Sequence, residues 1–180
     1  MTSKTLVRSA LAVLAVAVLS ACGDSPAEVP HNEADIAFAR QMVPHHAQAV
    51  EMADLVPGRT STPAVIAIAE RVKAAQAPEI ATMTGWLTAW GAAPDAHADH
   101  GADMPGMMAD TDMAALRSAT GEDFDQRWLA MMVVHHQGAI EMAERELAEG
   151  VNPDAKLLAQ QIIDAQRAEI REMQTLLPQG

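Results

Sequence analysis

The stretch "MVPHHAQAVEMA" (Met42–Ala53) recurs ninety residues later as "MVVHHQGAIEMA" (Met132–Ala143). When the chain is aligned with itself at this spacing, Asp35–Leu87 pairs with Asp125–Leu177 without a gap, and 17 of the 53 pairs are identical. The chain therefore contains an internal duplication. Because a short helical repeat cannot bury its apolar face alone, we expect the two copies to pack against each other.

Each copy predicts one long helix that carries the repeated motif. The first is expected at about 33–56 and its counterpart at about 122–149, where Gly150 is predicted to stop the helix in the left-handed conformation. Pro44 lies inside the first of these helices and Pro78 inside the helix that follows it, so local kinks are expected there.

A second helix is predicted in each copy. Thr62-Pro63 and Asn152-Pro153 each place an N-cap residue before a proline at the first helical position, and the helices should continue to about Trp90 and Leu177. Strand signals are nearly absent, with two Phe and no Tyr in the chain. The predicted fold is all-α, a four-helix bundle built from two duplicated helical hairpins.

The duplicated domain is predicted over 33–180, with repeats at about 33–90 and 122–177 and a His- and Met-rich linker at about 91–121. The linker begins with a segment rich in Gly, Pro, Asp and Ala, up to about Asp110, which we expect to be solvated and mobile. A short helix is predicted at about 111–119, with Met113 on its buried side. The tryptophans Trp86, Trp90 and Trp128 are expected to pack in the core or at its rim.

The first 22 residues resemble a bacterial lipoprotein signal. Lys4 and Arg8 precede the apolar run Ala10–Leu19, which is too short to span a bilayer, and "LSAC" ends at Cys22, the only cysteine. We predict lipidation of Cys22, a polar tether at 23–32 and an extracytoplasmic domain attached to the membrane through this lipid alone. A plain secretory signal is the alternative.

Composition limits the classes of partner. Removing the signal takes away two basic residues, so the formal charge changes from −12 to −14, with 10 basic against 24 acidic side chains. Such an acidic chain is not expected to bind nucleic acid and suits cations or simple solubility. With Cys22 used for lipid there is no thiolate ligand or disulfide. No nucleophile–base pair or phosphate-binding loop is recognisable, so an enzyme is not predicted.

The repeated motif places polar and sulfur-containing side chains on one helix face, because an α-helix turns by about 100° per residue. Glu51 and Glu141 point to the opposite side and are left out of the candidate site. The shared face carries these residues in the two copies: Asp35, Met42, His45, His46 and Met52, and Asp125, Met132, His135, His136 and Met142.

The second helices repeat a shorter motif. Gln76, Glu79 and Met83 share one face with apolar residues, as do Gln166, Glu169 and Met173. A carboxylate buried without a partner costs several kcal/mol, so both glutamates need a donor or a cation. Histidines on the neighbouring helix are the obvious candidates.

Two interpretations of these matched sets stay open. One is a hydrogen-bonded His–Glu–Gln layer that fixes the packing, with methionine as adaptable filler. The other is a metal site formed by the four histidines, the six motif methionines and the two glutamates, supported by Gln76, Gln166, Asp35 and Asp125. Thioether and imidazole ligands without cysteine suit copper, although other transition metals are possible. Two interpretations also stay open for the linker: a second metal site at His97, His100, Met104, Met107 and Met108, or a flexible strap whose methionines pack back on the bundle.

The chain resembles the bacterial secreted proteins classified as domain of unknown function 305. The resemblance rests on Met-x-x-His-His-x-x-Ala-x-x-Met at Met42–Met52 and Met132–Met142, and on Gln-x-x-Glu-x-x-x-Met at Gln76–Met83 and Gln166–Met173. It covers essentially the whole chain after the signal. It implies a ferritin-like four-helix fold and, because some members bind copper outside the cytoplasm, copper sequestration or transfer, including a possible partner protein that receives the metal.

Two other functions are weighed beside copper binding. A metal-free helical interaction module would use the duplication only for packing. A ferritin-like di-metal oxidase would need Glu-x-x-His motifs and further inward glutamates. Neither Glu79 nor Glu169 is followed by histidine three residues later, which disfavours the oxidase.

Overall fold

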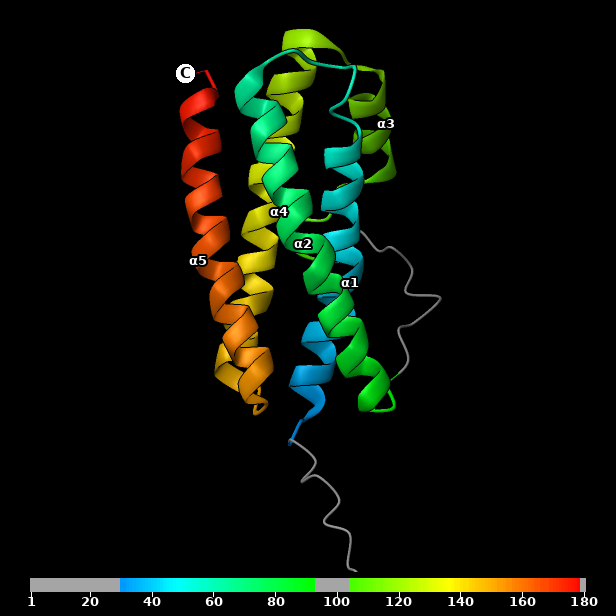
Figure 1. Cartoon of the computed structure of the whole chain (residues 1–180), viewed down its shortest axis with the longest axis vertical. Coiled ribbons are helices and arrows are strands. Elements are labelled where there is room, and N and C mark those ends of the chain that lie inside the picture. Colours follow the sequence, from blue (N-terminus) through cyan, green and yellow to red (C-terminus); the bar gives the residue numbers. More distant parts are fainter. Residues whose placement is uncertain (1–29, 93–103, 179–180) are drawn as a thin grey trace, which may run out of the picture.

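The structure, a computed structural model, describes residues 30–92 and 104–178 (Figure 1). Five helices account for most of these residues, and none of them is a strand. The helices are α1 (Glu33–Asp54), α2 (Pro63–Ala89), α3 (Asp110–Ser118), α4 (Gly121–Glu149) and α5 (Pro153–Leu176). The predicted all-α bundle of two helical hairpins is confirmed.

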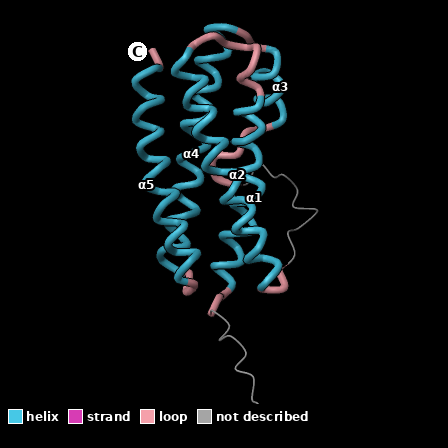
Figure 2. Tube along the Cα trace, viewed as in Figure 1, coloured by secondary structure: helices cyan, strands magenta, loops and turns pink. Residues whose placement is uncertain are grey.

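The two repeats form two hairpins that meet along one seam. Helix α1 packs against α2 and helix α4 against α5, and the hairpins are joined mainly through contacts between α1 and α4 (Figures 1 and 2). The C-terminal end of α1 lies against the N-terminal half of α4, where the Trp128 indole donates a hydrogen bond to the carbonyl of Met52 at 2.9 Å. The motif-bearing helices are therefore antiparallel, and their repeated motifs meet near the middle of the seam.

Helix ends agree with the sequence in part. Asn32 caps α1 in a capping box with Asp35, and the Asn152 side chain accepts hydrogen bonds from the first turn of α5. Thr62 precedes α2, but the prediction of a side-chain cap was wrong because its hydroxyl donates to Asp125 at 2.5 Å instead. In this way Thr62 links the start of α2 to α4 in the other hairpin.

Helix α4 ends just before Gly150, as predicted, but the glycine does not adopt the left-handed conformation expected of a helix-ending glycine. Its φ is −69°, an extended conformation open to any residue. The glycine is needed for space, because a Cβ there would lie 2.2 Å from the Glu146 carboxyl. Helix α4 ends where the Asp35 carboxylate of the other repeat accepts hydrogen bonds from the backbone N–H groups of Val151 and Asn152.

The core consists of two apolar clusters, one toward each end of the bundle. Phe124 and Trp128 are fully buried in the cluster nearer the N-terminus of α4, while Phe38 and Leu87 belong to the other. Trp86 and Trp90 pack partly buried against the second cluster, and Met113 of α3 is buried in the first, as predicted.

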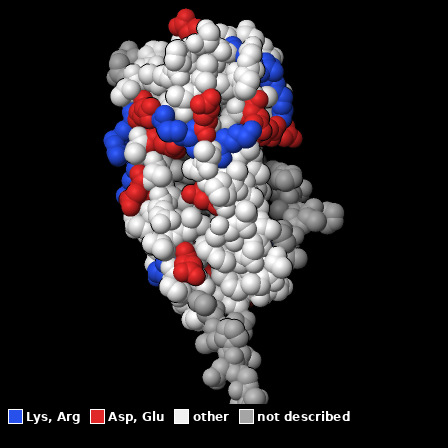
Figure 3. All heavy atoms as spheres, in the orientation of Figure 1, with Lys and Arg blue, Asp and Glu red and all other residues white. Residues whose placement is uncertain are grey.

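Charged side chains form a belt around one part of the surface (Figure 3). Several ion pairs join different helices: Arg71 of α2 with Glu172 of α5 at 2.5 Å, Lys73 of α2 with Asp54 of α1, and Arg117 of α3 with Glu51 of α1. Because these pairs are about half exposed, each contributes only about 0–1 kcal/mol to stability. Among the described helices, none has the length and apolar character needed to cross a membrane.

Candidate functional site

One histidine of each repeat meets its counterpart at the α1–α4 seam. The rings of His45 and His135 are fully buried, with centroids 3.7 Å apart and planes inclined by 32°. Among residues 30–92 and 104–178, none of their four ring nitrogens has a hydrogen-bond partner. Leaving a buried polar atom unpaired costs about 1–3 kcal/mol, so the pair is a costly feature for packing alone.

The second histidine of each motif contacts a glutamate on the other helix of its own hairpin. His46 contacts Glu79 of α2 at 2.8 Å, and His136 contacts Glu169 of α5 at 2.7 Å, both through Nε2. The histidines are fully buried, whereas the glutamate side chains are 21% and 16% exposed. As predicted, the glutamates find their donors on the neighbouring helix, and adjacent histidines point to different partners.

Burial keeps the central histidines neutral. Desolvation, followed by the nearby His46, lowers the pKa of His45 to about 3. The Pro105 carbonyl acts in the opposite direction, although it does not form a hydrogen bond of standard geometry with the ring. Desolvation and the neighbouring His45 likewise hold the pKa of His135 well below its usual value. At neutral pH both imidazoles therefore keep a free lone pair.

The six motif methionines divide equally between the two ends of this histidine layer. All of them are buried, and each set of three combines residues from both hairpins. One apolar cluster contains Met52, Met132 and Met173, and the other contains Met42, Met83 and Met142. The duplication thus produces two equivalent halves, each with a His–Glu pair and three thioethers, on either side of the His45–His135 pair.

Two predicted supporting residues lie away from this layer. Asp35 is ten residues before His45, about 15 Å along the helix axis, and accepts backbone hydrogen bonds from Asn32, Val151 and Asn152. Asp125 occupies the matching place in the second repeat and binds Thr62. Both aspartates join the ends of the hairpins.

The glutamines of the second motif stay near the core. Gln76 and Gln166 are buried, and the carbonyl oxygen of each side chain has no hydrogen-bond partner. They offer additional unpaired oxygens on α2 and α5.

The methionine-containing end of the linker is docked on the bundle. The segment Met104–Met108, called the strap below, is half-buried, and the amide of Gln48 on α1 pairs with both backbone groups of Met108. The expectation of a solvated, mobile segment was therefore wrong for these residues. The linker histidines His97 and His100 lie outside the described residues.

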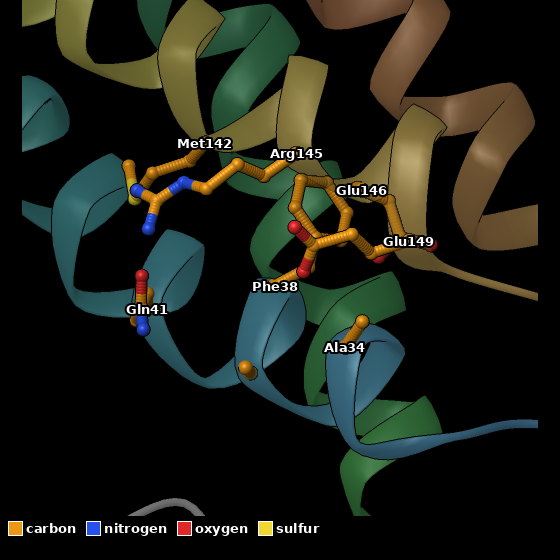
Figure 4. Close-up of a pocket in the computed structure, with 8 residues that line it drawn as sticks. Ala34, Phe38, Gln41, Met142, Arg145, Glu146 and Glu149 are labelled. Atoms are coloured by element: carbon orange, nitrogen blue, oxygen red, sulfur yellow. The ribbon is translucent and has the colours of Figure 1, made fainter.

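The buried carboxyl of Glu146 was not predicted as a feature of the core. It is 1% exposed on α4 and lines a small pocket of about 70 Å³ between α1 and α4, together with Phe38 and Met142 (Figure 4). Desolvation, and then the neighbouring Asp35, raise the pKa of Glu146 to about 8. Its position four residues after Met142, on the same helix face, is the signal that could have revealed it.

Carboxylates do not gather in a di-metal arrangement. In the part of the chain that the structure describes, no group of three or more His, Asp or Glu side chains is positioned to hold a metal ion. Glu51 and Glu141 are exposed and paired with Arg117 and Arg145, as their helix face predicted. An ion at the centre would therefore depend on the histidine nitrogens and methionine sulfurs.

Known proteins with this architecture were found by structural comparison. A DUF305 protein from Streptomyces coelicolor, provisionally described as secreted, is 35% identical over 79% of this chain and 91% of its own, with a TM-score of 0.73. A DUF305 fragment from Deinococcus radiodurans is 30% identical over 82% and 97%, with a TM-score of 0.74. CopM in its Cu(I)-bound form is 29% identical over 79% and 94%, with a TM-score of 0.66.

CopM has also been solved in Cu(II)-bound, silver-bound and metal-free forms. A comparison with curated proteins found no significant match. The model of the domain of unknown function DUF305 matches residues 35–177, which span both repeats and the linker between them. The chain therefore belongs to the DUF305 family.

Proposed function

We propose that this chain is an extracytoplasmic, lipid-anchored metal-binding protein whose principal cargo is copper, in sequestration or in transfer to a partner protein. The fully buried His45–His135 pair carries this proposal, because its imidazoles are held neutral by burial and no group in the described part of the chain bonds to their four ring nitrogens. A soft cation would use these lone pairs, whereas a packing layer would be better served by apolar side chains.

The donor set fits a soft ion better than a hard one. Thioether sulfur prefers Cu(I), and imidazole accepts Cu(I), Cu(II) and other transition metals. The residues that would hold the ion are His45 and His135 with the methionine sets at either end of the layer. Glu79 and Glu169 would orient His46 and His136 through the hydrogen bonds already present.

Relatives support this assignment by analogy. CopM, of similar fold and about 29% identity, has Cu(I)-bound, Cu(II)-bound and silver-bound forms. The linker residues His97, His100, Met104, Met107 and Met108 would form a secondary site. Lipid attachment at Cys22 rests on the signal-like N-terminus, and the description of the Streptomyces relative agrees with export.

The competing function is a metal-free packing module. It is favoured by the His46–Glu79 and His136–Glu169 hydrogen bonds, which satisfy both carboxylates without an ion. It gives no role to the unpartnered nitrogens of His45 and His135, which is why we place it second.

Cation affinity of paired variants separates the two functions. We expect His45→Ala with His135→Ala to weaken Cu(I) binding, measured by chelator competition, by more than tenfold, or more than about 1.4 kcal/mol. Titration calorimetry with Ag(I), which does not change oxidation state, should show the same loss. His31→Ala is the matched control, because that histidine stacks on Trp90 at the end of the bundle and not in the layer.

A second pair of variants guards against unfolding. His45→Leu with His135→Leu fills the space while removing all four nitrogens. If the Leu variant folds and no longer binds Ag(I), the metal-binding function is supported. If its Ag(I) affinity equals that of the unsubstituted protein, the histidine pair is a packing feature and the assignment of the metal site to it is wrong; if neither protein binds Ag(I), the proposed function is wrong.

A further inference from the structure

The two copies of the motif differ just after their histidines, and the differing residues hold the strap. Position 48 is glutamine in "HHAQA", and its counterpart, position 138, is glycine in "HHQGA". A perfect duplication would place equal side chains on both sides of the α1–α4 seam. The single strap crosses that seam once, so it needs a different contact on each helix.

On α1, Gln48 holds the strap by two hydrogen bonds. Its amide nitrogen donates to the Met108 carbonyl at 3.0 Å, and the Met108 backbone N–H donates to its side-chain oxygen at 2.8 Å. Both backbone groups of one strap residue are thereby satisfied by one side chain. An alanine at this position could make neither bond.

On α4, Gly138 allows the strap backbone to touch the helix backbone. A Cβ at position 138 would lie 2.0 Å from the Pro105 carbonyl oxygen. Gly106 has φ +76°, and a Cβ there would meet the His135 carbonyl at 2.9 Å. Because the obstructing atoms are backbone, a side chain at position 138 requires the strap to move.

The strap therefore lies directly over the central histidines. Gly106 contacts the backbone of His135, and the Pro105 carbonyl lies close enough to His45 to influence its pKa. The strap backbone thus packs against the seam beside two rings that are fully buried.

The strap is a weakly held cover. Its own residues are half-buried, and Gln48 supplies its only side-chain hydrogen bonds among those found in the described residues. Its outer edge borders a cleft of about 290 Å³ lined by Met107, Met113 and Glu51, so there is space into which the strap can move. Elements with few buried contacts open locally at much lower cost than the helices beneath them.

We propose that the strap is a gate over the His45–His135 pair and that Gln48 and Gly138 set its closed position. Resting on the metal-binding function proposed above, a soft cation would reach the pair by displacing the strap. Gln48 and Gly138 are then positioning residues that control access to the site without being ligands.

Chemical modification tests the gate without any metal. We would treat the purified protein with diethyl pyrocarbonate, which acylates accessible neutral imidazoles, and follow each histidine by peptide mass spectrometry. In Gly138→Ala the rate at His45 and His135 should rise at least about tenfold, because buried rings react only through the open population. Gly85→Ala is the matched control, since that helical glycine has open space at its Cβ position.

A milder variant keeps the test valid if Gly138→Ala does not fold. Gln48→Ala removes the two hydrogen bonds and should also increase modification of the pair, whereas Gln160→Ala on the exposed face of α5 should not. Ag(I) association, followed by stopped-flow fluorescence, should also accelerate in both gate variants. In each variant the factor should be similar to the increase in its modification rate. If modification and association are unchanged in folded Gln48→Ala and Gly138→Ala, the strap is not a gate.

The outcomes for gate and metal binding are separable. Faster modification in the variants together with Ag(I) binding by the unsubstituted protein supports both proposals. Faster modification in a protein that binds no Ag(I) supports the strap as a cover and overturns the proposed function.

Discussion

Replacement of Glu146 by glutamine should remove a pH dependence of stability that arises in the core. Glu146 is 1% exposed and lies beside the fully buried Asp35, which is already hydrogen-bonded to the backbone of Asn32, Val151 and Asn152. Two carboxylates cannot hydrogen-bond to each other without a proton. No hydrogen bond of standard geometry joins the two carboxyl groups, but a protonated Glu146 avoids the two like charges that an ionised one would bury beside Asp35.

The size of the effect follows from the pKa. Burial, and then Asp35, raise the pKa of Glu146 from 4.5 to about 8. Because the folded state holds the Glu146 proton over this range and the unfolded state releases it, the contribution of Glu146 to stability is complete below pH 4.5 and is lost as the pH rises to 8. The shift corresponds to at most about 5 kcal/mol, and we expect a loss of about 2–3 kcal/mol because water reaches the site when it relaxes.

Glutamine keeps the shape of the side chain and can donate to Asp35 at every pH. We expect the stability of Glu146→Gln relative to the unsubstituted protein to rise by about 2–3 kcal/mol between pH 5 and pH 9, because the pH dependence that comes from the buried histidines is common to both proteins and cancels in the difference. Urea unfolding at a series of pH values, followed by the fluorescence of buried Trp128, gives the free energies by linear extrapolation.

The neighbouring Glu149→Gln is the matched control, because it lines the same pocket but is exposed. It should leave the slope of the unsubstituted protein intact. A stability difference between Glu146→Gln and the unsubstituted protein that stays constant from pH 5 to pH 9 would refute a proton held by Glu146 beside Asp35.

Two further predictions concern the strap and the N-terminus. Replacing Met104, Met107 and Met108 together by leucine should change stability by less than about 1.5 kcal/mol, because volume is nearly kept and the bonds to Gln48 use backbone atoms. The Ag(I) capacity of this triple variant, measured by titration calorimetry, should be lower by at least one ion. An unchanged capacity would exclude a metal site in the strap. Cys22→Ser should move the protein from the membrane fraction to the soluble extracytoplasmic fraction or block its processing, as seen by fractionation and immunoblotting. A processed variant that stays in the membrane fraction would contradict lipidation.

Much of the fold could be predicted because its causes are local. The bounds of the helices agree with the prediction to within two residues, since Pro63, Pro153 and Asn152 act through the geometry of a single turn. The failures at Thr62 and Gly150 share one reason. Thr62 bonds to Asp125 of the other repeat, and Gly150 makes room for the Glu146 carboxyl, which lies beside Asp35 of the other repeat. Both outcomes therefore depend on contacts between the repeats, which no local rule contains.

The sequence predicted which helix faces carry the residues of the candidate site, but it did not predict how these residues lie relative to one another. Helical spacing determines that His45 and His46 differ by about 100° and that one of them can meet Glu79 on the neighbouring helix. It does not determine how α1 packs on α4. The stacking of His45 on His135, with four unpartnered nitrogens, follows from that packing.

By itself the sequence determined the duplication, the helices and the residue types on each buried face, because these depend on periodicity and capping within one repeat. Only the tertiary structure decided that the repeats meet antiparallel at the histidines, that Glu146 lies beside Asp35, and that the strap is docked through Gln48 and Gly138. The reason is that a duplicated sequence predicts two equal halves, whereas a single strap across their seam must break the symmetry. In the sequence, Gly138 indicates only a weak point in a helix. The structure shows why a glycine is needed there, because the backbone of Pro105 lies against it.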